Sequence, residues 1–324
     1  MFRRLFRAAA VVAVATALAS PAFAQAWPDR TVRLVVPYPP GGNVDAAARI
    51  VANKLNEMFG KPFIVDNKPG AGGMIGAESV ARAAPDGYTL FVAANGPLIF
   101  SPIIFGRSPY HWSKDFEPIS TISITPLVLQ VNPAIQANDL KAFIALAKAS
   151  NPPLLMASPG AGTTNHLASE LLRKVTGADW TTVHYKGNAP ATTDVIAGHA
   201  NFNFDQVSVA LPYVKDGRTR ALAVTSESRV PQLPDVPTFR EAGFKDFEAS
   251  TFTGLLAPAK TPAPIIDALS QALTKILKEP DVIERFQALG SEARAMTPAD
   301  FTAYIRSVDE RWTPIIKEAK INAN

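Results

Sequence analysis

The chain has 324 residues, of which 47% are hydrophobic and 19% charged, and it contains no cysteine. A chain without cysteine is not a disulfide scaffold, so its hydrophobic core must supply the stability, and about 300 residues fit two domains better than one. The formal net charge is +4 and the sequence has no dense stripe of lysine and arginine, which argues against nucleic acid as a partner.

Residues 1–24 have the three parts of a secretory signal peptide. Arg3, Arg4 and Arg7 precede a short apolar run, and residues 21–24 end in the small residues typical of a cleavage site. A membrane anchor is the alternative, but the apolar run is short for a helix that spans a bilayer. We therefore expect cleavage after Ala24, which leaves 29 basic and 28 acidic residues, a net charge of +1.

Strand and helix patterns alternate through the next part of the chain. Residues 32–38 are apolar and β-branched and predict a strand, and the apolar spacing of residues 44–59 predicts a helix. A strand at residues 63–67, a glycine-rich loop at 68–73, a helix at 74–84 and a strand at 88–93 follow. This order predicts a parallel sheet with helices on both faces.

Strand and helix patterns also alternate in the middle of the chain, but the sequence has no repeat of fixed period. A strand is predicted at residues 154–158, a loop at 159–163, a helix at 165–175 and a strand at 181–185. Pro190 suits the first position of a helix that continues to residue 197. Short strands are predicted at residues 201–205 and 220–226.

The last third is mostly helical, with helices predicted at residues 264–277, 279–289 and from Pro298 to Trp312. These helices need a sheet to cover, and the simplest arrangement returns them to the first lobe. Two extended stretches, near residues 117–131 and 247–258, could cross between lobes and form a hinge. We expect an α/β fold with lobe 1 at residues 25–124 plus 252–324, lobe 2 at residues 125–251, and a cleft between them.

Two glycine-rich turns have the design of an anion site. PYPPGGNVD (residues 37–45) and SPGAGTTNH (158–166) each follow a predicted strand and precede a predicted helix. At such a turn glycine lets the backbone approach a ligand, and the free N–H groups and dipole of the helix favour a carboxylate or phosphate. Asn43 or Asp45 could cap the first helix, and Thr163 or Thr164 the second. A tight turn without a ligand is the alternative for either loop.

Three further residues follow strands predicted to end at the same edge of a sheet. Asn95, Tyr185 and Asp205 could line the cleft there. A half-buried core aromatic is the alternative for Tyr185, and a loop cap is the alternative for Asp205. Lys186 also fits an ordinary surface charge.

Catalytic and metal motifs are missing. The sequence has no G-x-S-x-G elbow, no cysteine nucleophile, no H-E-x-x-H and no third glycine for a dinucleotide fingerprint. His166 follows a capping threonine and fits the first turn of a helix better than a catalytic role.

Long segments resemble the Bug, or tripartite tricarboxylate receptor (TctC-like), family of periplasmic solute-binding proteins. They include PYPPGGNVDAAAR, VDNKPGAGGMIGAESVARAAPDGYTL, SPGAGTTNHLASELL, VHYKGNAPATTDVIAG and DGRTRALAVTSESRVPQLPDVPTFREAG, in order along nearly the whole mature chain. The resemblance implies a periplasmic, two-lobe Venus-flytrap fold of type II, with each lobe a mixed, mainly parallel sheet flanked by helices. It also implies a small ligand, usually a carboxylate, in the interlobe cleft.

By this resemblance the first turn holds one end of the ligand through backbone amides and ordered waters, and the second turn holds the other. The ligand-binding residues expected are Tyr38, Gly41, Gly42, Asn43, Asp45, Asn95, Ser158, Gly160, Gly162, Thr163, Thr164, His166, Tyr185 and Asp205. Asn43 and Val44 depart from the residues common in the family, which leaves the ligand open among carboxylates, aromatic acids, amino acids and amide-bearing rings.

We therefore expect a monomeric binding protein, without cofactor or metal, that delivers a small carboxylate to the membrane subunits of a tripartite tricarboxylate-type transporter. A receptor that reports its ligand to a membrane kinase is the first alternative. A periplasmic enzyme built on the same cleft is the second, and a turnover assay would separate it from a binding protein.

Overall fold

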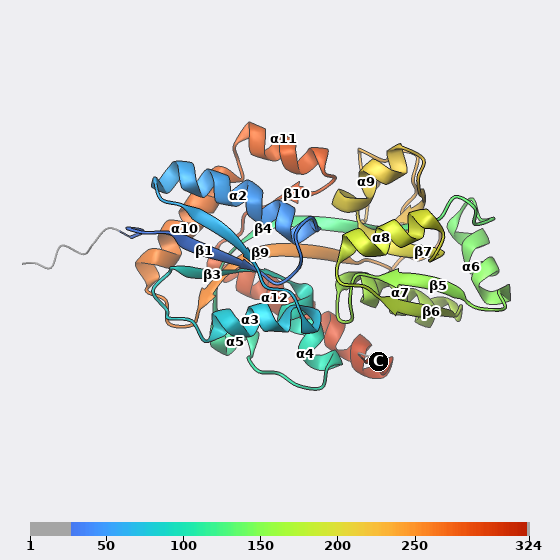
Figure 1. The fold of residues 1–324 in the computed structure, drawn as a ribbon, viewed down its shortest axis with the longest axis horizontal. Helices are drawn as coiled ribbons and strands as arrows, with labels where there is room; N and C mark the ends of the chain where they lie inside the picture. Colours follow the sequence, from blue (N-terminus) through green and yellow to red (C-terminus); the bar gives the residue numbers. More distant parts are fainter. Residues whose placement is uncertain (1–26, 323–324) are drawn as a thin grey trace, which may run out of the picture.

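The computed structural model describes residues 27–322, and the predicted signal peptide therefore lies outside the described residues. Sheet and helices form two lobes side by side (Figure 1). The strands are β1 (Val32–Val36), β2 (Phe63–Asn67), β3 (Thr89–Ala94), β4 (Phe116–Val131), β5 (Leu154–Ser158), β6 (Trp180–His184), β7 (Phe202–Gln206), β8 (Arg220–Val224), β9 (Ser250–Pro258) and β10 (Glu292–Ala293). The helices are α2 (Asn43–Phe59), α3 (Met74–Ala81), α4 (Ser101–Ile104), α5 (Trp112–Asp115), α6 (Leu140–Ala149), α7 (Thr164–Thr176), α8 (Asn188–Ala197), α9 (Val207–Lys215), α10 (Ala263–Ile276), α11 (Pro280–Ala288) and α12 (Pro298–Glu318), with a 3₁₀ turn at Ala71–Gly73 and a π turn at Gly96–Phe100.

The strands follow the order β2-β1-β3-β9-β4-β7-β5-β6, with β8 and β10 also paired to β4. β1 pairs in parallel with β2 and β3, and β5 pairs in parallel with β6 and β7. Every antiparallel pair involves β4 or β9. The expected mixed sheet is confirmed, but its mainly parallel character holds only for the strands away from β4 and β9.

Strand β4 changes partners along its length. Its residues from Phe116 to Pro126 pair with β9, whereas Leu127 to Val131 pair with β7 and β8. The Thr225 hydroxyl lies at this change, because it accepts a hydrogen bond from the Leu127 amide at 2.8 Å and donates to the Ala249 carbonyl. One side chain thus joins β4 to the segment that enters β9.

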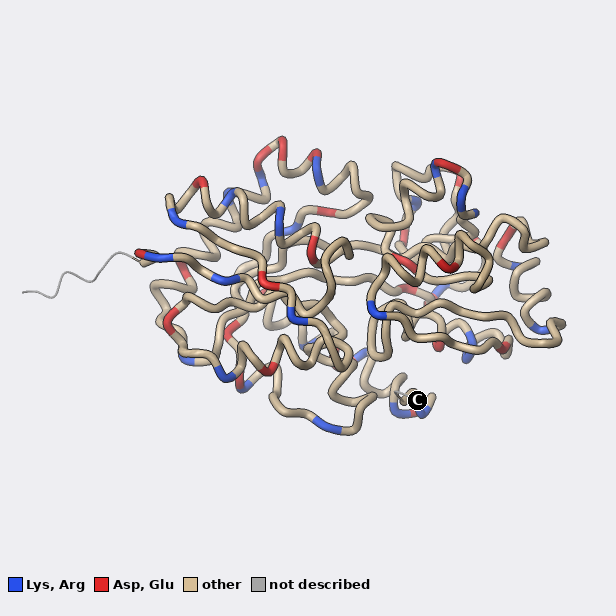
Figure 2. The backbone as a smooth tube through the Cα atoms, viewed as in Figure 1, with Lys and Arg blue, Asp and Glu red and all other residues tan. Residues whose placement is uncertain are grey.

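Alternation along the central strands places apolar side chains on both faces of the sheet. In β1, Leu34 and Val36 face the core under α2, α10 and α11, whereas Val35 faces the core that includes α3 and α12. Figure 1 shows these helices on opposite sides of the strands. Figure 2 shows lysine, arginine, aspartate and glutamate mixed along the outer helices and loops, without a stripe of one sign among the described residues.

Four helices were not predicted from the sequence: α4, α5, α6 and α9. Pro190 is not the first residue of its helix, because α8 already begins at Asn188 with Gly187 as its N-cap. Phe301 and Ile305 of α12 share a core with Val35 and Phe91, and the return of the C-terminal helix to the first lobe stays a prediction.

Candidate functional site

The turn between β1 and α2 is capped by backbone rather than by a side chain. Gly41 has a φ of 87°, and Gly42 is the N-cap of α2, with extended backbone and no side-chain cap. The expectation that Asn43 or Asp45 caps α2 is therefore wrong, because Asn43 is already the first helical residue. The amides of Asn43 and Val44 donate to no residue in the range 27–322, so the N-terminus of α2 keeps free donors.

Asp45 fixes this turn instead of capping the helix. Its Oδ2 accepts from the Gly41 amide at 3.0 Å and from Arg49 Nε at 2.9 Å, and its Oδ1 accepts from Asn67 Nδ2 at 2.9 Å. Burial by itself raises the pKa of Asp45, but the hydrogen bonds from Arg49, Gly41 and Asn67 outweigh burial and hold the pKa below its ordinary value. The carboxylate is ionised and engaged within its own lobe.

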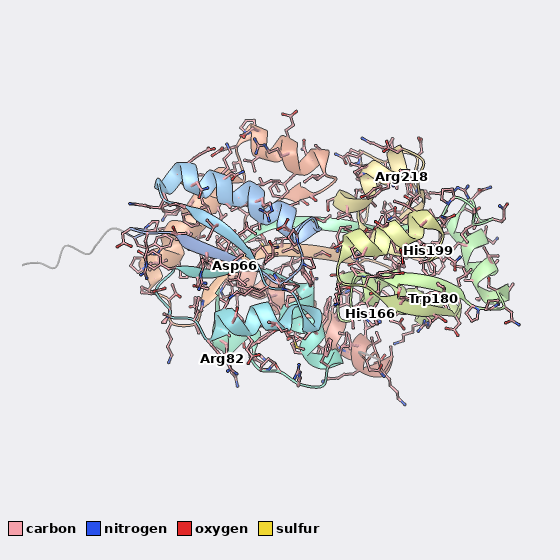
Figure 3. The ribbon with its side chains drawn as sticks, in the orientation of Figure 1. Asp66, Arg82, His166, Trp180, His199 and Arg218 are labelled. Carbon is pink, nitrogen blue, oxygen red and sulfur yellow. The ribbon has the colours of Figure 1, made fainter. Side chains whose placement is uncertain are left out.

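The second turn, between β5 and α7, has the expected cap. Thr163 is the N-cap, and its hydroxyl accepts from the His166 amide at 3.3 Å and donates to the Gly160 carbonyl at 2.8 Å. His166 lies near the boundary between the lobes (Figure 3), and its Nδ1 accepts from the Gly162 amide at 3.3 Å. Burial, His184 and Arg173 lower the pKa of His166 to about 3, so it is a neutral part of the turn.

A third helix N-terminus meets the first two. Gly187 is the N-cap of α8, and Asn188 is its first residue. Gly187 packs against Pro39 of the first turn, since an added Cβ on Gly187 would lie 3.3 Å from Pro39 Cγ. From the sequence we expected Tyr185 of this segment, rather than Asn188, to line the cleft.

The three helix N-termini enclose a cavity of about 30 Å³, which holds about two water molecules. Its lining contains no lysine, arginine, histidine, aspartate or glutamate. The lining residues are Tyr38, Gly42, Asn43, Val44, Pro159, Thr163, Thr164, Asn165, Gly187, Asn188, Gln206 and Thr251. Positive potential here comes from helix ends and free amides rather than from side-chain cations.

Asn43, which lines this cavity, carries an unpaired donor. Its Oδ1 accepts from Thr125 Oγ1 at 3.0 Å and from Ser208 Oγ at 2.8 Å. Its side-chain nitrogen is buried and has no hydrogen-bond partner among the residues that the structure describes. The residue is only 5% exposed, so this nitrogen is a buried donor without a partner beside the cavity.

Of the fourteen residues expected to bind ligand, five line the cavity: Tyr38, Gly42, Asn43, Thr163 and Thr164. Gly41, Ser158, Gly160 and Gly162 belong to the turns that carry these five, and Asp45 and His166 brace the same turns. The role of each as a ligand contact stays a prediction.

Asn95, Tyr185 and Asp205 do not line the cavity. Asn95 joins two strands, since its Nδ2 donates to the Ser250 carbonyl at 3.2 Å and its Oδ1 accepts from the Phe252 amide at 2.9 Å. The Tyr185 hydroxyl donates to Asp194 at 2.7 Å.

Asp205 is buried under the α8 end of the cavity. It accepts hydrogen bonds from Thr192 Oγ1, Asn188 Nδ2 and the Gln206 amide. Burial raises the pKa of Asp205 to about 6, against these hydrogen bonds. The sequence did not identify Asn165, Asn188 or Gln206 as site residues, because an amide side chain carries no motif until its neighbours are known.

The two lobes touch each other around the cavity. Ser208 of α9 donates to Asn43 of α2, and Ser101 Oγ of α4 lies 3.4 Å from the Gly162 carbonyl. On the outer surface, Lys174 of α7 pairs with Glu318 of α12 at 2.9 Å. The two lobes thus contact each other on more than one side of the small cavity.

The model of the tripartite tricarboxylate transporter family receptor matches residues 47–321. The chain belongs to this family. Within the family, Protein BugT of Bordetella pertussis is 34% identical over 307 residues, which are 94% of each chain.

Solved structures of family receptors have the same two-lobe fold. Rpa4515 of R. palustris with adipate is similar with a TM-score of 0.88 and 31% identity, over 91% of this chain and 99% of that one. The periplasmic binding protein BugD has a TM-score of 0.83 and 32% identity, over 91% and 99%. MatC of Rhodopseudomonas palustris with bound malate has a TM-score of 0.83 and 32% identity, over 90% and 100%.

Among residues 27–322, no cluster of three or more histidine, aspartate or glutamate side chains could hold a metal ion. No helix in that range has the length and apolar character needed to cross a membrane.

Proposed function

We propose that this receptor captures a small carboxylate between its lobes and delivers it to the membrane subunits of a tripartite tricarboxylate-type transporter. The observation that carries the proposal is the convergence of three helix N-termini on one cavity without a charged lining. The unpaired donor of Asn43 lies beside this cavity. Free N–H groups and helix dipoles favour an anion. Adipate and malate, bound by the related receptors, have this chemistry.

The lobes open to admit the ligand. A cavity of about 30 Å³ has no room for a dicarboxylate, so entry requires the lobes to separate. The lobes are residues 25–124 plus 252–324 and residues 125–251, and the pivot lies where β4 changes partners, beside Thr225. Closure then follows from contacts that a ligand makes only when both lobes reach it.

Capture without turnover fits the chemistry of the cavity. No histidine, lysine or carboxylate lines it to act as a general base, and His166 uses its Nδ1 within its own turn. A binding protein needs only polar groups that hold the ligand and release it unchanged.

The experiment is a thermal-shift screen of residues 25–324 after unfolding and refolding to strip co-purified ligand. The panel contains mono-, di- and tricarboxylates, aromatic acids and amino acids. A ligand at 100 times its Kd should add about 2.7 kcal/mol to the free energy of unfolding. Stabilisation by a carboxylate that is recovered unchanged supports the proposal, whereas a folded protein that no carboxylate stabilises refutes it.

A further inference from the structure

The orientation of the side-chain amides in the second lobe is set by a backbone carbonyl. Asn165 Nδ2 donates to the Phe204 carbonyl at 2.8 Å, and a carbonyl can only accept. Asn165 Oδ1 therefore faces Gln206 and accepts from its Nε2 at 3.0 Å. This turns Gln206 Oε1 toward Asn188, whose Nδ2 donates to it at 2.8 Å.

Asp205 fixes the same orientation independently. Its carboxylate accepts from Asn188 Nδ2, so both hydrogens of that nitrogen are used, one toward Gln206 and one toward Asp205. The side-chain oxygen of Asn188 must then point the other way. Within residues 27–322 this oxygen accepts no hydrogen bond, and Asn188 lines the cavity.

The free oxygen of Asn188 faces the N-terminus of α2. It lies 3.0 Å from the position that a Cβ on Gly42 would take, and Gly42 is the N-cap of α2. A carboxylate seated on the free amides of Asn43 and Val44 would therefore have a hydrogen-bond acceptor beside it. An acceptor repels a carboxylate oxygen and binds a donor, so the atom next to the ligand carboxylate should carry a donor.

The charge of the cavity selects a hydroxyl over an ammonium as this donor. Three helix N-termini give the cavity a positive potential, and no aspartate or glutamate lines it to balance a ligand cation. We propose that Asn188 reads a hydroxyl group on C2 of the ligand, so that the receptor prefers 2-hydroxycarboxylates to the unsubstituted acids and to 2-amino acids. The inference rests on the proposed function, that a carboxylate binds at the start of α2.

The test measures Kd by calorimetry with stripped protein and three sets of acids matched in length. The sets are lactate, propionate and alanine; malate, succinate and aspartate; and 2-hydroxyadipate, adipate and 2-aminoadipate. In whichever set binds, the hydroxy acid should bind about tenfold more tightly than the unsubstituted acid, since the latter leaves the Asn188 oxygen unpaired. The amino acid should bind more weakly than the hydroxy acid.

Two variants assign the preference to Asn188. Asn188→Ala should bring the hydroxy and unsubstituted acids within about twofold of each other. Ala189→Ser, at the exposed next position of α8, should keep the parental ratio. Thermal unfolding without ligand verifies that each variant folds, and the comparison in the parent protein tests the preference even if Asn188→Ala does not fold.

The outcomes separate the two proposals. Equal affinity for hydroxy and unsubstituted acids, or tighter binding of the amino acid, overturns the role of Asn188 and leaves carboxylate capture standing. A preference that survives in Asn188→Ala also overturns it. Binding of none of the nine acids overturns the role of Asn188, and carboxylate capture is overturned as well only if no carboxylate of the thermal-shift panel stabilises the protein.

Discussion

Replacing Gly42 with alanine should weaken ligand binding without weakening the fold. Gly42 has φ −90° and ψ 173°, a conformation that any residue adopts, so a side chain adds no backbone strain within lobe 1. The new Cβ would lie 3.0 Å from Asn188 Oδ1, in the opposite lobe. The clash therefore exists only when the lobes are closed.

The size of the effect follows from the cost of overpacking. A contact of this kind costs about 1–3 kcal/mol, which is about a 5- to 150-fold loss of affinity when it falls on the closed form alone. The free energy of unfolding without ligand should stay constant or rise by up to about 1 kcal/mol, because alanine restricts the unfolded chain. Gly42→Val should lose at least as much affinity.

Gly41→Ala is the matched control at the adjacent position. Gly41 has a φ of 87°, and an added Cβ there has no atom within 4 Å. Alanine should therefore cost about 1–2 kcal/mol of stability through its left-handed backbone, with a smaller loss of affinity than Gly42→Ala. Calorimetric Kd values and urea unfolding of both variants are the assays. If Gly42→Ala bound ligand with the same Kd as the unsubstituted protein, the turn before α2 would not close against Asn188 in the ligand-bound form.

Two further changes test Asp205 and Asn95, which do not line the cavity. Because burial raises the pKa of Asp205 from 3.8 to about 6, the stability it contributes is complete below about pH 4 and is lost as the pH rises through 6. Relative to Asp205→Asn, the parental free energy of unfolding should fall by roughly 2 kcal/mol between pH 4 and pH 7 in urea titrations, and parallel pH profiles would contradict this. Asn95→Ala should lose about 1–3 kcal/mol of stability, because the buried Phe252 amide loses its acceptor, with Kd within about threefold of the parent. A loss of affinity at unchanged stability would instead indicate that Asn95 contacts the ligand.

Periodicity and glycine turns were enough to predict much of the fold from the sequence. The strands at Phe63–Asn67 and Leu154–Ser158 lie at their predicted residues, because each combines an apolar run with clear turn signals on both sides. Helices α5 and α9 were missed for physical reasons: α5 has only four residues, and α9 follows β7 without a turn residue between them. Pro212 inside α9 also argued against a helix there.

The two glycine-rich turns of the candidate site could be predicted from the sequence, but the hydrogen-bond network between its side-chain amides could not. Glycine and threonine spacing identified the starts of α2 and α7, because local chemistry decides those conformations. Asn165, Asn188 and Gln206 come from three separate segments, and only the tertiary fold brings their amides into contact. The capping of α2 by Asn43 was a wrong prediction, because tertiary contacts with Thr125 and Ser208 engage its side chain instead.

The position of β9 has a consequence for the order in which the chain can complete its structure. β9 lies between β3 and β4 in the sheet, although both strands precede it in the sequence by more than a hundred residues. Until residue 258 is in place, β3 and β4 each keep an unpaired edge, and the whole of lobe 2 lies in the loop that must close. The N-terminal portion alone would therefore present two open strand edges. During folding the sheet is completed late, when β9 from the C-terminal half of the chain pairs with β3 and β4.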